Sequence, residues 1–198
     1  MSTNTVNIKV IIGSVRAGRY ADKPANWMAN KLREQVGVEV EVIDLKEYDM
    51  PFFNEAVSPS FKSAPFDNPV VASFTRKIAE ADGFILVTPE YNHAPSAVLK
   101  NALDWVGPEW ANKAVAFVGY GSTAGARAVD QLRPVASELQ MADVQKAVHI
   151  PPQEVFPVVM GQQNFAEYTG ALEEQSGLLI TQLLLWARAL KTVRSENS

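Results

Sequence analysis

The segment from Gly13 to Arg19, GSVRAGR, combines residue types that bind phosphate groups. Ser14 offers a hydroxyl donor, and the guanidinium forks of Arg16 and Arg19 match the geometry of phosphate oxygens. Gly18 lets the backbone turn tightly and come close to a ligand. Because the segment leads toward an expected helix N-terminus, which favours anions, we expect it to bind a phosphate monoester. The alternative is a plain strand-to-helix turn with solvated arginines.

A second unusual segment, TPEYNH, runs from Thr88 to His93 and brings together a proline, an aromatic ring and an amide. We expect the loop of Pro89, Glu90, Tyr91 and Asn92 to lie where a flat heterocycle binds, and an isoalloxazine suits it. Ordinary structural roles remain open. Tyr91 could be a half-buried aromatic residue, and Asn92 could be the N-cap of the next helix.

Glycines also recur in a third segment, GYGSTAG, which starts at Gly119. Such a loop after a strand could let backbone amides approach the edge of a planar ring, or it could be a simple turn. It is not a dinucleotide fingerprint, because that motif follows the first strand of its unit. A nucleotide triphosphatase is also disfavoured, because Arg19 and Tyr20 stand where a Walker loop requires Lys and Ser or Thr.

Alternating strand-like and helical patterns predict the elements that position these loops. Runs rich in Val and Ile predict strands at Ile8–Ile12, Val38–Leu45, Gly83–Thr88, Ala114–Gly119 and Val144–Ile150. Helical patterns cover about Pro24–Gln35, Val70–Ala81, Ala97–Trp105, Ala124–Leu139 and Gly170–Ala189. The order of strand then helix, with nearly continuous apolar runs in three of the strands, indicates a doubly wound α/β domain with a parallel sheet.

The topology of such a sheet predicts where the site lies. Ligands bind beyond the carboxyl ends of the strands, at the point where the strand order reverses. With five strands in the order 2-1-3-4-5, that point lies between the first and third strands. The loops Gly13–Arg19 and Thr88–His93 follow these two strands, so we expect them to meet.

Composition narrows the class of protein. The 198 residues fit one domain, residues 1–198, and their 47% hydrophobic content suffices for a single core. The lack of cysteine removes disulfides and thiolate chemistry, and two histidines make an imidazole metal site improbable. A net charge of −4 disfavours nucleic-acid binding. Met1 to Asn7 lacks the pattern of a secretory signal. The longest apolar stretch, Leu178 to Leu190, is too short to span a membrane. We therefore expect a cytoplasmic protein.

Two connecting segments are longer than ordinary loops, Lys46 to Pro69 and Pro151 to Tyr168. Each could pack against the surface or another subunit, or could form a lid beside a ligand. The residues that could cover an aromatic cofactor are Pro51, Phe52, Phe53, Phe156 and Pro157.

Taken together, these segments resemble the NADPH-dependent FMN reductase family of flavodoxin-like proteins, from about Ile8 to Ile150. The motifs that carry the resemblance are GSVRAGR, PEYNH, LKNALDW from Leu99 and GYGSTAGARAVDQLRPV from Gly119. It implies a flavodoxin-like three-layer sandwich. The chain departs from the family pattern at two places. Arg19 and Ala21 stand where the family often has Ser and Asn, and Pro95 lies one position earlier than the proline that often follows the histidine of this motif.

The resemblance also implies a site and partners. FMN would be held noncovalently, with Ser14, Arg16 and Arg19 near its phosphate. The loop Pro89–Asn92 would lie along the isoalloxazine, and the residues at another edge would be Gly119, Tyr120, Gly121 and Ser122. Homodimers or homotetramers are expected, with flavin sites near a subunit interface.

The expected activity is reduction of small acceptors such as free flavin, quinones, chromate or azo compounds by NADPH or NADH. The flavin carries the chemistry, so no catalytic acid or base is expected, and the kinetics should be ping-pong. Arg127, Arg133 and Lys100 could reach a substrate phosphate, but surface ion pairs are their commoner fate. The alternatives are a flavodoxin-like electron carrier or sensor that does not turn over NAD(P)H, and a structural domain that has lost its cofactor.

Overall fold

A five-stranded parallel sheet organises the computed structural model, which describes residues 5–61, 66–166 and 168–196. The strands are β1 (Val6–Ile12), β2 (Val38–Asp44), β3 (Gly83–Pro89), β4 (Ala114–Tyr120) and β5 (Ala142–Ile150). Their order is β2-β1-β3-β4-β5, and every neighbouring pair is parallel. The predicted fold class and strand order are confirmed. The expectations for residues 1–4, 62–65 and 167 fall outside the described residues.

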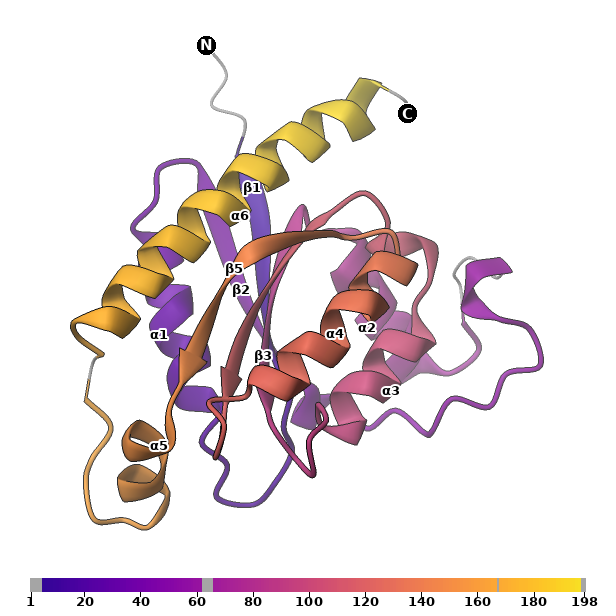
Figure 1. The fold of residues 1–198 in the computed structure, drawn as a ribbon. Helices are drawn as coiled ribbons and strands as arrows, with labels where there is room; N and C mark the ends of the chain where they lie inside the picture. The colour runs from indigo at the N-terminus through magenta and orange to yellow at the C-terminus, as the bar shows by residue number, and fades with distance from the viewer. Residues whose placement is uncertain (1–4, 62–65, 167, 197–198) are drawn as a thin grey trace.

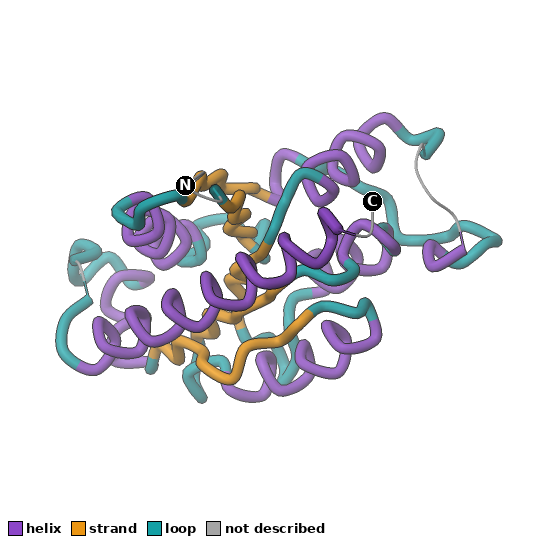
Figure 2. The backbone as a smooth tube through the Cα atoms, turned by 90° about the horizontal axis from the view of Figure 1, so that it is seen from above, coloured by secondary structure: helices purple, strands orange, loops and turns teal. Residues whose placement is uncertain are grey.

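Helices cover both faces of the sheet (Figures 1 and 2). They are α1 (Asp22–Arg33), α2 (Pro69–Ala79), α3 (Ala97–Trp105), α4 (Ala126–Glu138), α5 (Pro152–Val159) and α6 (Ala171–Glu196), with short 3-10 turns at Leu45–Glu47, Pro59–Phe61 and Pro108–Trp110. One core lies between the sheet, α1 and α6, and the other between the sheet and α2, α3 and α4. This is the three-layer arrangement that buried parallel strands require.

The register of the central strands brings the loops of interest to one level. Every residue of β3 and β4 is buried, because helices pack on both of their faces. Ile12 of β1 is paired with Val87 of β3, and Thr88 with Gly119 of β4. In Figure 1 the strand arrowheads point toward α5, and both termini lie at the opposite end.

Gly13 continues this register into the first loop. Its N–H donates to the Val87 carbonyl oxygen at 2.8 Å. A Cβ at this position would lie 2.6 Å from the same oxygen, so no larger residue fits without displacing a central strand.

Two parts of the expected helical structure are wrong in detail. The segment Pro151 to Tyr168, expected to be irregular, contains α5; its first residue, Pro152, occupies a helix position that tolerates proline. Helix α6 was expected to end at Ala189 and continues to Glu196. Lys191 and Arg194 of the added turns contact Asp82 at 2.7 and 2.5 Å, which holds the end of the helix on the sheet.

In the part of the chain that the structure describes, no helix is both long and apolar enough to cross a membrane. Within the same residues, no group of three or more His, Cys, Asp or Glu could hold a metal ion.

Candidate functional site

A cleft of about 220 Å³ lies at the carboxyl ends of β1, β3 and β4, beside α5. The predicted site residues that line it are Arg16, Arg19, Pro89, Glu90, Tyr91, Tyr120, Gly121 and Ser122. Ser14, Asn92 and Gly119 are not among its lining residues. The cleft therefore gathers parts of all three segments at the reversal point of the strand order.

The two arginines of the first loop have different surroundings. The Arg16 side chain is exposed and makes no ion pair with any described residue. The Arg19 side chain is 14% exposed and pairs with Asp44 at the end of β2, with 2.7 Å between Nη1 and Oδ1. Arg19 also donates to the Ser14 carbonyl oxygen at 2.7 Å. Burial alone would raise the pKa of Asp44, but the hydrogen bond from Arg19 lowers it, so this pair is charged and anchors the loop.

Ser14 connects the first two loops beneath the cleft. Its side chain is fully buried, and its hydroxyl lies 3.1 Å from the Tyr91 hydroxyl. The Ser14 oxygen also accepts a hydrogen bond from the Arg16 backbone N–H at 3.4 Å. Ser14 thus orients the loop that carries Arg16 against the ring of Tyr91.

The start of α1 is open to an anion. Its N-cap residue, Ala21, provides no side-chain hydrogen bond to the first turn. The Lys23 N–H donates to the Tyr20 carbonyl oxygen at 3.0 Å and Pro24 has no N–H, so the helix start offers the Arg16 loop chiefly the positive end of its dipole. Asp22 in the same turn opposes an anion, and its buried Oδ1 has no hydrogen-bond partner among the described residues. The exposed guanidinium and the positive helix end fit a phosphate group, whereas the Asp22 carboxylate opposes it.

The loop after β3 forms a tight turn in which Tyr91 and Ala94 exchange backbone hydrogen bonds of 2.9 and 3.1 Å. Asn92 and His93 have left-handed backbone, with φ of 50° and 70°. The alternative role of Asn92 as N-cap is wrong, because Ser96 caps α3 by accepting the Leu99 N–H at 3.2 Å.

Ser96 has a further contact that the sequence did not suggest. Its hydroxyl donates to the Gly13 carbonyl oxygen, and its side chain is buried. The loop after β1 and the start of α3 are therefore joined. In the sequence, a serine just ahead of a helical pattern predicts a helix N-cap, but it does not predict the second hydrogen bond of Ser96 to Gly13.

The third segment contributes its backbone. Gly119 lies under Gly125, and a Cβ at Gly119 would be 2.9 Å from the Gly125 carbonyl oxygen, so Gly119 serves the close packing of the turn. Gly121 has φ of 142°, which side chains rarely adopt, and it lines the cleft with Ser122. A glycine-rich backbone at the edge of the cleft fits the approach of a planar ring.

Aromatic and apolar residues form a wall that sequence reasoning found only in part. The rings of Tyr20 and Tyr120 lie 5.3 Å apart and both line the cleft. Burial raises the pKa of Tyr20 to about 12, so its hydroxyl is neutral at physiological pH. Helix α5 contributes Val155, Phe156 and Val159 to this wall, of which the sequence predicted only Phe156. The Phe156 side chain is 44% exposed at the cleft. Recognising α5 as a helix would have predicted that these side chains share a face.

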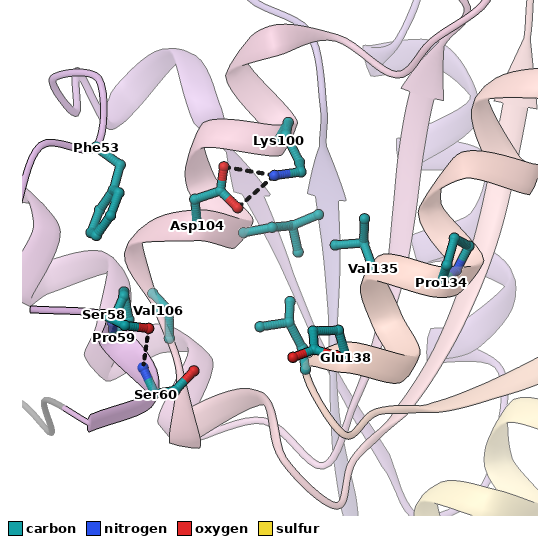
Figure 3. A pocket seen from close by; sticks show the side chains of 12 residues that line it. Phe53, Ser58, Pro59, Ser60, Lys100, Asp104, Val106, Pro134, Val135 and Glu138 are labelled. Atoms are coloured by element: carbon teal, nitrogen blue, oxygen red, sulfur yellow. Dashed lines mark hydrogen bonds and ion pairs between the residues drawn. The ribbon is translucent and has the colours of Figure 1, made fainter.

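The other candidate cover, Pro51 to Phe53, packs elsewhere. The Trp105 indole N–H donates to the Pro51 carbonyl oxygen at 2.7 Å, and the Phe53 ring lies 5.2 Å from the Trp105 ring. The segment therefore packs on α3. There Phe53 lines a separate pocket of about 490 Å³ between α3, α4 and the 58–60 turn, beside the ion pair of Lys100 and Asp104 (Figure 3).

The larger pockets are less suited to a flavin phosphate than the smaller cleft. A pocket of about 530 Å³ lies between α1 and a group of residues that includes Phe165, Tyr168 and Glu173. The α3–α4 pocket approaches the C-terminal ends of α3 and α4. Helices that follow parallel strands run back along the sheet, so those helix ends lie away from the carboxyl ends of the strands. The cleft alone among these three joins Arg16 to the glycine-rich backbone.

The three basic residues considered for a substrate phosphate are engaged in ion pairs. Lys100 pairs with Asp104 at 2.7 Å, Arg127 with Glu90 at 3.0 Å, and Arg133 with Asp143 at 2.6 Å. This is the commoner fate that the sequence left open.

Solved structures with this architecture include FerB of Paracoccus denitrificans, described as a flavoenzyme NAD(P)H:(acceptor) oxidoreductase. It aligns with 95% of this chain and 98% of its own, with a TM-score of 0.61 and 19% identity. At that identity the likeness establishes the fold, which is flavodoxin-like.

Sequence relatives identify the family. The family model described as NADPH-dependent FMN reductase matches residues 6–154. An NAD(P)H-dependent FMN reductase of Schizosaccharomyces pombe is 32% identical over 87% of this chain and 88% of its own length. An NADPH:quinone oxidoreductase of Arabidopsis thaliana is 28% identical over 93% and 91%. The chain belongs to the NADPH-dependent FMN reductase family, which confirms the resemblance carried by its motifs.

Proposed function

We propose that this protein is an FMN-dependent NAD(P)H oxidoreductase that reduces small acceptors such as free flavins and quinones. The observation that carries the proposal is the cleft at the reversal point of the sheet, where an exposed arginine, an uncapped helix and a glycine-rich backbone meet. When bound there, FMN would supply two-electron transfer from NAD(P)H to the acceptor, while the protein supplies orientation and electrostatics.

Each part of the cleft has a role in this proposal. Arg16 and the start of α1 bind the phosphate, and Arg19 adds charge nearby while it anchors the loop to Asp44. Ser14 fixes the first loop to Tyr91. The lining residues of the second and third loops, Pro89–Tyr91 and Tyr120–Ser122, hold two sides of the ring.

The size of the cleft supports an accessible flavin. Pockets that enclose a drug-sized ligand measure about 300–1,000 Å³. At about 220 Å³ this cleft would cover only part of FMN, and one face of the ring would be open to reactants. A single open face serves NAD(P)H and the acceptor in turn, which is the basis for ping-pong kinetics.

An absorbance titration tests this function. Protein with added FMN should show flavin bands that bleach when NADPH or NADH is added without oxygen, and colour should return with a quinone. Binding without bleaching would support the electron carrier or sensor instead. A protein that binds no FMN would contradict the proposal.

We further propose that the chain acts as one FMN-binding domain and assembles into homodimers or homotetramers. Several large apolar side chains are exposed, which is what a subunit interface requires: Phe52 at 79%, Phe61 at 87% and Leu185 at 67%. Light scattering of the purified protein should give two or four times the 21.7 kDa chain mass. A monomer at micromolar concentration would contradict this assembly.

We also propose that the protein acts in the cytoplasm, because NAD(P)H, the proposed reductant, is an intracellular metabolite. Fractionation of cells that express the tagged chain would test this. Recovery outside the cytoplasm would refute it.

A further inference from the structure

The N-terminus of α4 is capped by a carboxylate from a different loop. Its N-cap residue, Gly125, has left-handed backbone with φ of 72° and provides no side-chain cap. The Glu90 carboxylate, which follows β3, instead accepts the Arg127 backbone N–H at 3.2 Å. Because the first N–H groups of a helix have no partner inside it, Glu90 satisfies one of them from the neighbouring loop.

The same carboxylate makes two more contacts around this helix start. Thr123 Oγ1 donates to Glu90 Oε2 at 2.7 Å, and Arg127 Nη1 donates to Oε1 at 3.0 Å. The Glu90 side chain is 3% exposed, whereas that of Arg127 is 44% exposed. Burial would raise the pKa of Glu90, but the hydrogen bonds from Thr123 and Arg127 lower it, so the carboxylate is charged and fully engaged.

The loop held in this way has an unusual backbone. The φ angles of Gly121, Ala124 and Gly125 are 142°, 56° and 72°. A left-handed non-glycine residue such as Ala124 is unfavourable unless its surroundings hold it. Glu90 ties this loop by its main chain as well, because its N–H donates to the Tyr120 carbonyl oxygen at 3.0 Å.

We propose that Glu90 is a positioning residue whose carboxylate fixes the Gly121–Ser122 backbone in the place where it meets the bound flavin ring. The proposal rests on the proposed function. Glu90 lines the cleft beside Tyr91, Gly121 and Ser122, but its carboxylate oxygens are taken by Thr123 and Arg127 at the start of α4. Glu90 thus acts on the flavin through the loop.

Hydrogen exchange of the protein without added FMN tests the loop directly. In Glu90→Ala the amide of Arg127 and those of residues 121–125 should exchange about 10-fold faster, the effect expected from losing one helix cap. Asp143→Ala is the matched control, because it breaks the ion pair of another arginine of α4, Arg133, away from the cleft. Unchanged exchange in Glu90→Ala would overturn the capping role.

Flavin binding tests the second half of the proposal. By quenching of FMN fluorescence, Glu90→Ala should bind FMN about 10-fold more weakly. Glu90→Gln keeps an acceptor for Thr123 and the Arg127 amide and should recover most of the affinity. Arg127→Ala should lose about 3-fold or less, because it keeps the backbone N–H and removes only a half-exposed ion pair.

The midpoint potential of bound FMN separates positioning from stability. It should shift in Glu90→Ala, return toward wild type in Glu90→Gln and be unchanged in Asp143→Ala. Wild-type affinity and potential in a folded Glu90→Ala protein would overturn the positioning role. If the wild-type protein itself binds no FMN, the proposed function fails and the flavin role of Glu90 falls with it, while exchange alone decides the capping role.

Discussion

Removal of the Arg16 guanidinium should weaken FMN binding without weakening the fold. The side chain is exposed at the cleft, and its guanidinium makes no ion pair or hydrogen bond with a described residue, so Arg16→Ala removes no such interaction from the fold. A hydrogen bond to a charged group contributes about 1.5–3 kcal/mol. At this exposed position we expect the lower part of that range, about 1.5–2 kcal/mol, which is about a 10- to 30-fold rise in the Kd for FMN.

Arg19→Ala provides the contrast. Its guanidinium pairs with Asp44, and the two side chains are 14% and 21% exposed, so its loss leaves a partly buried carboxylate unpaired. We expect a loss of about 1–3 kcal/mol in the free energy of unfolding. In Arg16→Ala the urea midpoint should stay within experimental error of the wild type.

The assay is fluorescence titration of each variant with FMN and with riboflavin, which lacks the phosphate. Arg16→Ala should bind riboflavin as the wild type does, and its FMN deficit should shrink as salt is raised. Equal loss of both ligands, or unchanged FMN affinity, would refute the assignment of Arg16 to the phosphate. Loss of FMN affinity in Arg19→Ala with an unchanged urea midpoint would assign the phosphate to Arg19 instead.

Three further predictions concern stability. Gly13→Ala should lower the free energy of unfolding in urea by about 1–3 kcal/mol, because its Cβ meets a central-strand carbonyl oxygen. Gly18→Ala should lower it by only about 1 kcal/mol, because its Cβ has open space and only the left-handed φ of 64° opposes it. Because the folded pKa of Asp44 is lowered, its contribution is present above the ordinary pKa of Asp and is lost as pH falls from there through the lowered folded pKa. Asp44→Asn should flatten that acidic part of the stability curve. Asp82→Asn should speed hydrogen exchange in the last turns of α6, because Lys191 and Arg194 lose their charged partner.

Much of the fold followed from patterns within short stretches. The continuous apolar runs of β3 and β4 predicted strands buried on both faces, and the strand-helix alternation predicted the parallel sheet. Strand bounds were reproduced to within about two residues. Helix α5 was missed because the prolines at 151, 152 and 157 read as a loop, although Pro152 begins a helix acceptably.

The location of the candidate site also followed from sequence, through topology. Once the strand order is given, the loops after β1 and β3 must meet at the reversal point. Eight of the eleven predicted residues line the cleft. The other three, Ser14, Asn92 and Gly119, have residue types suited to ligands, but burial and backbone geometry direct them elsewhere.

The sequence by itself determined the class of fold, the family and the loops that converge, because apolar periodicity and short motifs are local properties of the chain. Only the tertiary structure decided what each polar side chain does in that site. Arg19 meets Asp44 across 25 positions and Glu90 meets Arg127 across 37, and these pairings depend on how the strands align rather than on the neighbouring residues. A buried charge must find its partner in space, and the spacing of residues along the chain does not specify that partner.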